Sequence, residues 1–202
     1  MVGARLRNNS LQLLQDTLDF WVLEKRFSFV DLPWTAERQY LEATRPVGAP
    51  DAALDTHYGQ FVCSGEQSFI ALWDQKRLAP AAGYIGWTPC IRNEPLDELH
   101  QYGFMKAELF CPVEAPEEGL ALVMGFLQAQ KTLFARLAAT HLDARIARQL
   151  ETVSVASNQW DINVGGIEVG SYGWREFKGQ LYAYGTALAE PRFSIAVKRT
   201  VG

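Results

Sequence analysis

The chain has 202 residues, of which 48% are hydrophobic and 21% charged, and 19 lysines and arginines against 23 aspartates and glutamates give a formal net charge of −4. This is the composition of a folded domain with a sizeable core, and it excludes a disordered chain. The sequence lacks the run of about 18 apolar residues that a membrane-spanning helix needs. The acidic balance gives no overall electrostatic footprint for nucleic acid.

The cysteines and the N-terminal segment bear on the compartment. Cys63, Cys90 and Cys111 are far apart and form no CxxC pair. Their number and spacing predict neither a disulfide framework nor a zinc site. The segment MVGARLRNNSLQLLQ has Asn, Ser and Gln where a signal peptide has an apolar run. We therefore expect a protein of the reducing cytoplasm.

Hydrophobic periodicity predicts a helix first. Leu11, Leu14 and Leu18 recur at helical spacing within residues 8–25. The elements expected next, in chain order, are a strand over 27–33 that ends at Pro33, a helix over 35–43 capped by Thr35, a loop over 45–53, a strand over 58–64 and a helix over 66–78.

The second half combines long strands with helices. We expect strands over 83–92 and 103–113 joined by the polar loop 93–102, a helical stretch over 117–150, strand character over 160–172 and 180–188, and a short last helix from Pro191 to near Arg199. A loop of that length is more often functional than structural. Hairpin-linked strands without a βαβ alternation predict an α+β fold with an antiparallel sheet, in a single domain spanning 1–202.

An arginine at a strand end opens the first group of candidate site residues. Arg92 ends the strand over 83–92, Glu94 follows two residues later and points to the same face, and Phe104 lies across the hairpin. Arginine can hold a phosphate bidentately, and an aromatic ring can stack a nucleobase. The alternative is a surface ion pair beside a core phenylalanine.

The second group contains two carboxylates. A tight turn at residues 164–166 would bring Asp161 and Glu168 side by side on neighbouring strands. Two carboxylates there suit Mg²⁺ bound together with phosphates. Arg175 lies beyond the next bend and could clamp a substrate carboxylate. The alternative is an ordinary hairpin with solvated charges.

The third group is a strand of small residues that leads into an arginine. The segment 185–192 reads GTALAEPR. Its small side chains would allow the close approach of a flat ligand, and Arg192, in the first turn of the last helix, could contact a phosphate. The alternative is a Gly/Ala-rich strand that packs in the core.

In this order, the three groups and a preceding strand resemble the motifs of class II aminoacyl-tRNA synthetases. FSFVDLPW resembles the first motif, a strand that ends on a proline at the dimer interface. YIGWTPCIRNEPLDELHQYGFMKAEL resembles the second motif, and GTALAEPRF the third. The resemblance implies the class II catalytic fold, an antiparallel β-sheet flanked by helices, and a homodimer formed through residues 27–34.

The spacing is closest to the aspartyl/asparaginyl branch, which includes the synthetase-like asparagine synthetases. That branch has Asp, Glu and Arg at intervals of seven, as in the second group above. Its motif-2 arginine precedes the adenine-stacking phenylalanine by twelve, as Arg92 precedes Phe104. The segment Asp97-x-x-His100 instead resembles the phenylalanyl branch.

The resemblance assigns the ATP contacts to five residues. Arg92 would hold the α-phosphate, Glu94 the adenine amino edge and His100 the γ-phosphate. Phe104 and Arg192 would sandwich the adenine. Arg92 and Arg192 would be catalytic, because their charges offset the phosphoryl charge that develops in the transition state.

The resemblance also assigns the substrate and metal contacts. Gln67 and Glu108 match positions near the substrate ammonium group. Arg175 matches the residue that grips the substrate's side-chain carboxylate or amide. Asp161 and Glu168 match the ligands of Mg²⁺ on the triphosphate.

The implied function is an ATP-dependent amino-acid-activating ligase with Mg²⁺ as cofactor. It would form an aminoacyl adenylate from aspartate or a similar amino acid. The acceptor would be ammonia, an amine, or a carrier protein or peptide. A tRNA acceptor is not expected, because no anticodon-binding domain is evident and the net charge is −4. In an asparagine-forming reaction, Arg175 would hold the α-carboxylate instead of the side chain.

Two other functions stay open. Ala187 and Ala189 stand where the family usually has glycines, Gly103 and Lys106 stand where it has glutamate and glutamine or another polar residue, and little sequence follows the third motif. The two alanines and the short C-terminus favour a catalytically silent synthetase-like regulatory or assembly subunit. A tRNA-dependent editing or transfer factor is disfavoured by the net charge.

Overall fold

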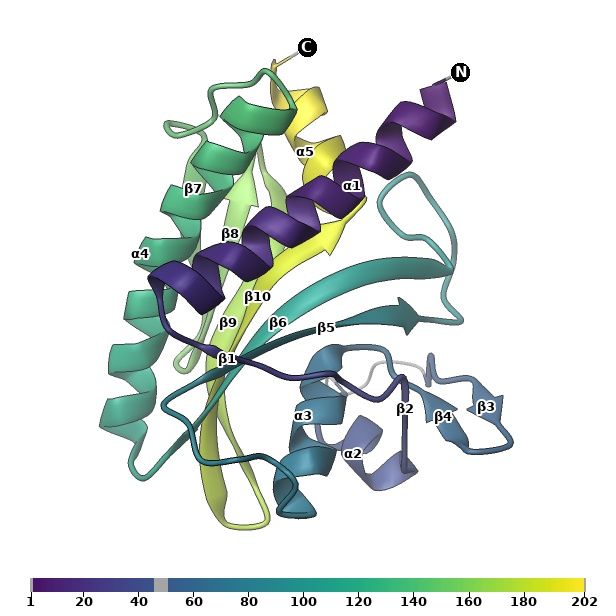
Figure 1. The fold of residues 1–202 in the computed structure, drawn as a ribbon, viewed down its shortest axis with the longest axis vertical. Coiled ribbons are helices and arrows are strands. Elements are labelled where there is room, and N and C mark those ends of the chain that lie inside the picture. The colour runs from purple at the N-terminus through teal and green to yellow at the C-terminus, as the bar shows by residue number, and fades with distance from the viewer. Residues whose placement is uncertain (1, 46–50, 202) are drawn as a thin grey trace.

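A seven-stranded, largely antiparallel sheet lies at the centre of the molecule (Figure 1). The computed structural model describes residues 2–45 and 51–201. All neighbouring strands are antiparallel except β1 and β5, which are parallel. From one edge to the other the strands are β1 (Ser28–Phe29), β5 (Tyr84–Ile91), β6 (Gly103–Val113), β10 (Gln180–Glu190), β9 (Ile167–Phe177), β8 (Gln159–Val164) and β7 (Leu150–Ala156).

Helices cover one face of this sheet (Figure 1). They are α1 (Val2–Asp19), which continues into the π-helical turn η1 (Phe20–Glu24), α4 (Pro116–His141), and α5 (Arg192–Val201) near the end of β10. The main hydrophobic core lies between these helices and the sheet. Gly185 of β10 is required there, because a Cβ at this position would lie 2.6 Å from the ring of Tyr172.

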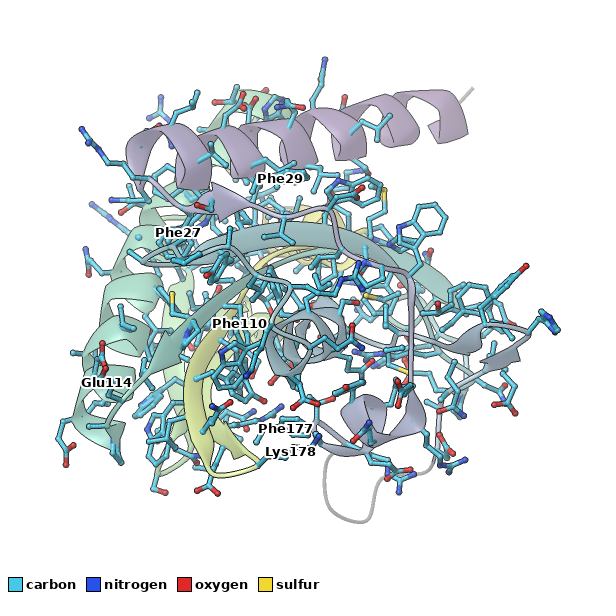
Figure 2. The ribbon with its side chains drawn as sticks, turned by 60° about the horizontal axis from the view of Figure 1, so that its bottom comes forward. Phe27, Phe29, Phe110, Glu114, Phe177 and Lys178 are labelled. Carbon is cyan, nitrogen blue, oxygen red and sulfur yellow. The ribbon has the colours of Figure 1, made fainter. Side chains whose placement is uncertain are left out.

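A smaller unit lies against the opposite face. It consists of α2 (Arg38–Glu42), α3 (Gly65–Asp74) and a three-stranded sheet of β2 (Thr35–Ala36), β4 (Gly59–Phe61) and β3 (Asp55–Thr56). Phe110 of β6, labelled in Figure 2, stacks on Phe69 of α3 with ring centroids 5.3 Å apart. A second hydrophobic cluster thereby fixes α3 under the central strands.

A register shift in β10 directs the end of this strand toward the site. Pairing with β6 is interrupted between Thr186 and Leu188, so that Ala187 and Leu188 both lie in the helix-side core while Ala189 lines a cavity on the other face. The buried Gln130 of α4 satisfies the shifted backbone, because its Nε2 donates to the Ala187 carbonyl (2.7 Å). Its Oε1 accepts from Trp21 Nε1 (3.2 Å).

The predicted α+β architecture with an antiparallel sheet flanked by helices is confirmed. The two long hairpins, β5–β6 and β8–β9, form where expected, the latter around Gly165 and Gly166 at φ 56° and 79°. The last helix also forms, over 192–201. In the part of the chain that the structure describes, no helix is both long and apolar enough to cross a bilayer.

Several predicted boundaries are wrong. Residues 117–150 are not one helix, since α4 ends at His141 and Leu150 begins edge strand β7, whose remaining residues are exposed and so carry no burial pattern. Thr35 does not cap a helix but pairs with Phe61 in β2. Only residues 28–29 of the predicted strand 27–33 form a ladder. The centre of the predicted loop 45–53, residues 46–50, lies outside the described residues.

We predict that Gln130→Leu lowers the free energy of unfolding by about 2–3 kcal/mol, because it leaves the Trp21 indole N–H and the Ala187 carbonyl buried without a partner. Gln128→Leu, on the exposed side of the same helix, serves as the matched control and should stay within about 0.5 kcal/mol of the wild type. Urea unfolding followed by tryptophan fluorescence measures both. Equal effects of the two substitutions would contradict this role of Gln130.

Candidate functional site

Two adjoining cavities lie on the sheet face opposite the long helices. The first has a volume of about 120 Å³ and the second about 330 Å³. They adjoin, since they share five lining residues, namely Arg92, Glu94, Lys106, Glu168 and Thr186. Alternation explains the lining from β6, because its every second side chain, Phe104, Lys106 and Glu108, points to this face.

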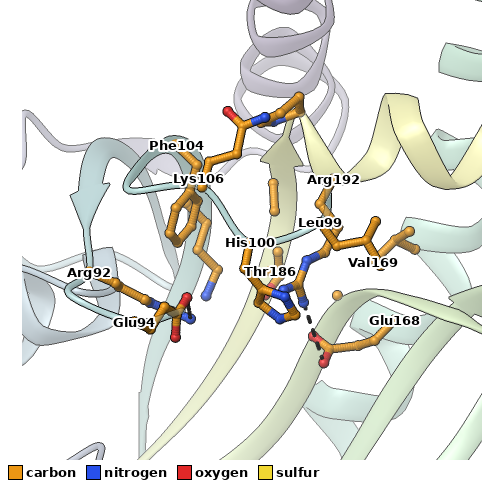
Figure 3. A pocket seen from close by; sticks show the side chains of 14 residues that line it. Arg92, Glu94, Leu99, His100, Phe104, Lys106, Glu168, Val169, Thr186 and Arg192 are labelled. Atoms are coloured by element: carbon orange, nitrogen blue, oxygen red, sulfur yellow. Dashed lines mark ion pairs between the residues drawn. The ribbon is translucent and has the colours of Figure 1, made fainter. Parts of the chain in front are cut away.

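The first cavity has an arginine on each side (Figure 3). On one side, Arg92 Nε donates to the Cys63 carbonyl (3.0 Å), its guanidinium lies 4.9 Å from the centre of the Phe104 ring, and Glu94 is 3.9 Å away. The strand end therefore fixes Arg92 by its backbone contact and leaves its remaining N–H groups toward the cavity.

On the other side, Arg192 begins α5 and lies 3.8 Å from Glu168 of β9 (Figure 3). The helix start is held by Glu190, whose carboxylate accepts from the backbone N–H and hydroxyl of Ser194 (3.0 and 2.9 Å). Burial raises the pKa of Glu190, while the bonds from Ser194 and Ser10 lower it. This anchoring sets the position of Arg192 relative to Phe104 across the cavity.

The loop between β5 and β6 brings His100 to the first cavity. Asp97 accepts from the backbone N–H groups of Leu99 and His100 (2.7 Å each), and its other oxygen lies 2.8 Å from His100 Nδ1. These bonds, that of the His100 side chain first, lower the pKa of Asp97 to about 2. The Asp97-x-x-His100 pattern thus stabilises the conformation of the loop through contacts within the loop itself. An ion pair between Glu98 and Arg199 connects the loop to α5.

At the base of the second cavity is a partly buried ion pair between α3 and the sheet. Arg175 of β9 donates to both carboxylate oxygens of Glu66 (2.9 and 3.0 Å), and Tyr182 donates to the same carboxylate (2.9 Å). Burial raises the pKa of Glu66, and the neighbouring Arg175 opposes this. Burial also acts to lower the pKa of Arg175, but Glu66, Tyr184 and Tyr182 together more than offset it and the net shift is upward. Arg175 stacks on the Tyr184 ring at 4.4 Å.

A second pair lies beside it. Glu108 of β6 is 3% exposed and accepts from Ser64 Oγ (2.6 Å), from the Glu66 backbone N–H (3.2 Å) and from Lys106 Nζ (2.6 Å). Gln67 closes the capping box of α3, since its Oε1 accepts from the Cys63 and Ser64 N–H groups. The Gln67 side chain therefore positions the helix start as well as lining the cavity.

The two carboxylates of the β8–β9 hairpin, Asp161 and Glu168, lie on strands whose pairing is irregular. Asp161 pairs with Ser171 and Asn163 with Glu168, because the ladder shifts register after Ile162. The expected direct cross-strand pairing of Asp161 with Glu168 is therefore wrong. The shift lets Glu168 and Ser171, three positions apart, both face the site.

The donor set of this hairpin fits a hard cation such as Mg²⁺. Asp161 Oδ1 and Asn163 Oδ1 are both buried without a hydrogen-bond partner, and Glu168 adds a carboxylate. Burial raises the pKa of Asp161, although Ser171 counteracts this. Oxygen ligands of this kind suit Mg²⁺ that is also held by phosphates. Among residues 2–45 and 51–201, no three His, Cys, Asp or Glu side chains gather as a complete protein-only metal site.

Most of the residues predicted from the sequence line the two cavities. Arg92, Glu94, His100, Phe104 and Arg192 line the first, and Gln67, Glu108 and Arg175 line the second. Glu168 lines both, whereas Asp161 lines neither and lies on the adjacent strand. Three site residues were missed, namely Glu66, Lys106 and Asn163. Lys106 and Asn163 alternate with Glu108 and Asp161 on their strands, which was the available signal, whereas Glu66 at the start of helix α3 had none.

Comparisons with known proteins identify the fold. No family model and no curated protein matches the sequence. A pyrrolysyl-tRNA synthetase from Desulfitobacterium hafniense superposes with a TM-score of 0.69 at 16% identity, over 94% of this chain and 69% of that one. Seryl-tRNA synthetase from Pyrococcus horikoshii, solved with ATP, superposes with a TM-score of 0.70 at 17% identity, over 97% of this chain and 52% of that one. The serine-tRNA ligase from Naegleria fowleri, solved with AMP, superposes with a TM-score of 0.66 at 15% identity, over 95% of this chain and 48% of that one.

The fold is that of the class II synthetase catalytic domain. The chain spans about half the length of the two seryl enzymes. At this level of identity the similarity concerns the fold alone, and the assignment to the aspartyl/asparaginyl branch stays a prediction.

We predict that Glu66→Gln lowers the free energy of unfolding by about 3 kcal/mol, because it leaves the largely buried Arg175 guanidinium without a counter-charge. Glu176→Gln, an exposed position on the same strand as Arg175, is the control and should change stability by less than about 0.5 kcal/mol. Urea unfolding at neutral pH measures both. If Glu66→Gln left the free energy of unfolding almost unchanged, the ion pair would not stabilise the packing of α3 against the sheet.

Proposed function

We propose that this chain is an ATP-dependent ligase that activates a carboxylic acid, aspartate or a similar amino acid, as an acyl adenylate and passes the acyl group to a non-tRNA acceptor. The observation that carries the proposal is that the two cavities adjoin and share Arg92 in their lining. One cavity has an aromatic ring and two arginines, which suit a nucleotide. The other has charged side chains at its base, which suit a small polar acid.

In this reaction an oxygen of the substrate carboxylate attacks the α-phosphorus of ATP. The new C–O–P link forms as the bond to the bridging oxygen breaks, and pyrophosphate leaves. No protein nucleophile is needed, because positioning and charge stabilisation lower the barrier. Arg92 and Arg192, from opposite sides of the first cavity, would offset the charge on the phosphoryl oxygens. Glu94 and Phe104 would orient the adenine, and His100 would meet the γ-phosphate.

Mg²⁺ held by Asp161, Asn163 and Glu168 would neutralise charge on the triphosphate when bound. Glu168 lines both cavities, and Asp161 and Asn163 lie on the neighbouring strand β8 with a buried oxygen each that has no hydrogen-bond partner, which supports this assignment.

The proposed acceptor is ammonia, an amine, or a carrier protein or peptide. The net charge of −4 supports an acceptor other than tRNA, whose binding relies on neutralising phosphates. In the second step the acceptor attacks the acyl carbon, and AMP leaves. The three free cysteines support a reducing, cytoplasmic location.

One observation favours a second candidate, a catalytically silent regulatory or assembly subunit. The first cavity, lined by Ala189, measures about 120 Å³, whereas ligand pockets usually measure about 300–1,000 Å³. ATP would therefore need the Arg92 and Arg192 side chains to move from their present ion pairs. Ala187 does not contribute to this narrowing, because it lies in the helix-side core.

We predict ATP–pyrophosphate exchange that depends on a carboxylic acid substrate and on Mg²⁺. Arg92→Ala should lower the exchange rate by about 100-fold or more, because it removes a charge that acts on the transition state. Arg77→Ala, an exposed arginine outside both cavities, should exchange like the wild type. A screen of the twenty amino acids and their amine-free analogues that gave no exchange would favour the silent subunit.

We also propose a homodimer that forms through residues 27–34. Among the described residues, β1 is an edge strand that pairs with β5, and two large apolar side chains of this segment are exposed, Phe29 at 49% and Trp34 at 53%. An unpaired edge with exposed apolar side chains is typical of an interaction surface.

We predict that Phe29→Lys combined with Trp34→Lys weakens dimerisation by at least about tenfold, because it places charges in the apolar contact. Tyr58→Lys, at a side chain that is 85% exposed in the β3–β4 turn, should leave the dimer intact. Sedimentation equilibrium at micromolar concentrations measures the dissociation constants. A monomeric wild type would contradict the proposal.

A further inference from the structure

The two carboxylates at the base of the second cavity are already neutralised by cations of the chain itself. Glu66 holds Arg175 and Tyr182, and Glu108 holds Lys106, Ser64 and a backbone N–H. Both carboxylates are at most 5% exposed. A substrate ammonium group that approached either one would meet a carboxylate that is already paired and a like charge beside it.

Lys106 lies at the junction of the two cavities, where a substrate's reacting carboxylate would meet ATP. Its side chain is only 15% exposed. Its Nζ lies 2.6 Å from Glu108 Oε1 and 3.2 Å from Ser64 Oγ. The protein's own ammonium group thus occupies the position beside Glu108 that the sequence resemblance reserves for the ammonium group of an amino acid.

Beside Glu66 and Glu108, the hydrogen-bonding capacity that is left is that of donors. The lining of the second cavity also includes Glu94 and Glu168, whose carboxylates lie 3.9 Å from Arg92 and 3.8 Å from Arg192. Within the described residues, Arg175 uses only Nη1 in hydrogen bonds, which leaves its Nε and Nη2 N–H groups for a ligand. Lys106 uses two of its three N–H groups. A ligand that brings acceptor oxygens matches these groups, and one that brings a further ammonium does not.

We propose that the substrate is a carboxylic acid without a protonated amino group beside its reacting carboxylate, such as a dicarboxylic or hydroxy acid, because Lys106 supplies that ammonium from the protein. This inference rests on the activation reaction of the proposed function and replaces its amino-acid substrate with an amine-free acid. Lys106 is then a specificity-determining residue that repels the ammonium of an amino acid and attracts the oxygens of an amine-free acid.

Isothermal titration calorimetry on the full chain tests this with pairs of ligands that differ in the amine: aspartate with succinate, alanine with propionate, and phenylalanine with 3-phenylpropionate. We expect the amine-free member of at least one pair to bind the wild type at least about tenfold more tightly than its partner. Lys106→Gln should reduce or reverse this preference, because it frees Glu108 to accept an ammonium.

Two further variants keep the test sharp. Lys178→Gln removes a lysine–carboxylate pair of 2.8 Å outside both cavities and should leave the preference unchanged. Lys106→Met replaces Lys106→Gln if that protein does not fold. The proposal is overturned if the amine-bearing member binds as well in every pair, if no amine-free acid binds, or if removal of Lys106 leaves the ratio unchanged.

Binding requires no turnover, so it separates this inference from the proposed function. Preference for an amine-free acid without pyrophosphate exchange would support the inference and contradict the activation reaction. Exchange with amino acids alone would support activation and contradict the role given to Lys106.

Discussion

The need to neutralise two buried carboxylates governs the architecture of this site. Glu66 at the start of α3 and Glu108 in the middle of β6 are both buried. A carboxylate without a counter-charge would be costly at such a position. Each finds its cation on a central strand, Arg175 on β9 and Lys106 on β6. The Glu66–Arg175 pair, together with the bonds that Glu108 accepts from Ser64 and the Glu66 N–H, joins the smaller unit to the main sheet. The same carboxylates and their cations line the second cavity, so the constraint that fixes α3 also shapes what the cavity can bind.

The same strands connect the fold to the proposed chemistry. Alternation places Lys106 and Glu108 on the site face, while the register shift in β10 keeps Ala187 in the core and turns Ala189 and the start of α5 toward the first cavity. Arg92 and Arg192 then stand at opposite sides of one space. The similarity to seryl- and pyrrolysyl-tRNA synthetases concerns this framework alone. The substrate class that we infer comes instead from the ion pairs of this chain's own side chains.

The sequence predicted those features that have a local cause. Arg92 and Phe104 could be placed because a strand, a polar loop and a second strand define a hairpin, and Arg192 because a proline precedes a helix start. The pairing of Asp161 could not be predicted, since it depends on a register shift that has no sequence signature. Glu66 and Arg175 are far apart in the chain, so only the folded arrangement of α3 against β9 reveals that they neutralise each other.

The central claim is that a carboxylate attacks the α-phosphorus of ATP on this face of the sheet. Transfer of ¹⁸O from a carboxyl-labelled acid to AMP, with hydroxylamine as acceptor and mass spectrometry of the nucleotide, tests it most directly. The account predicts labelled AMP together with the acyl hydroxamate, and loss of both in Arg92→Ala. Unlabelled AMP, or ADP and phosphate as the products, would contradict it.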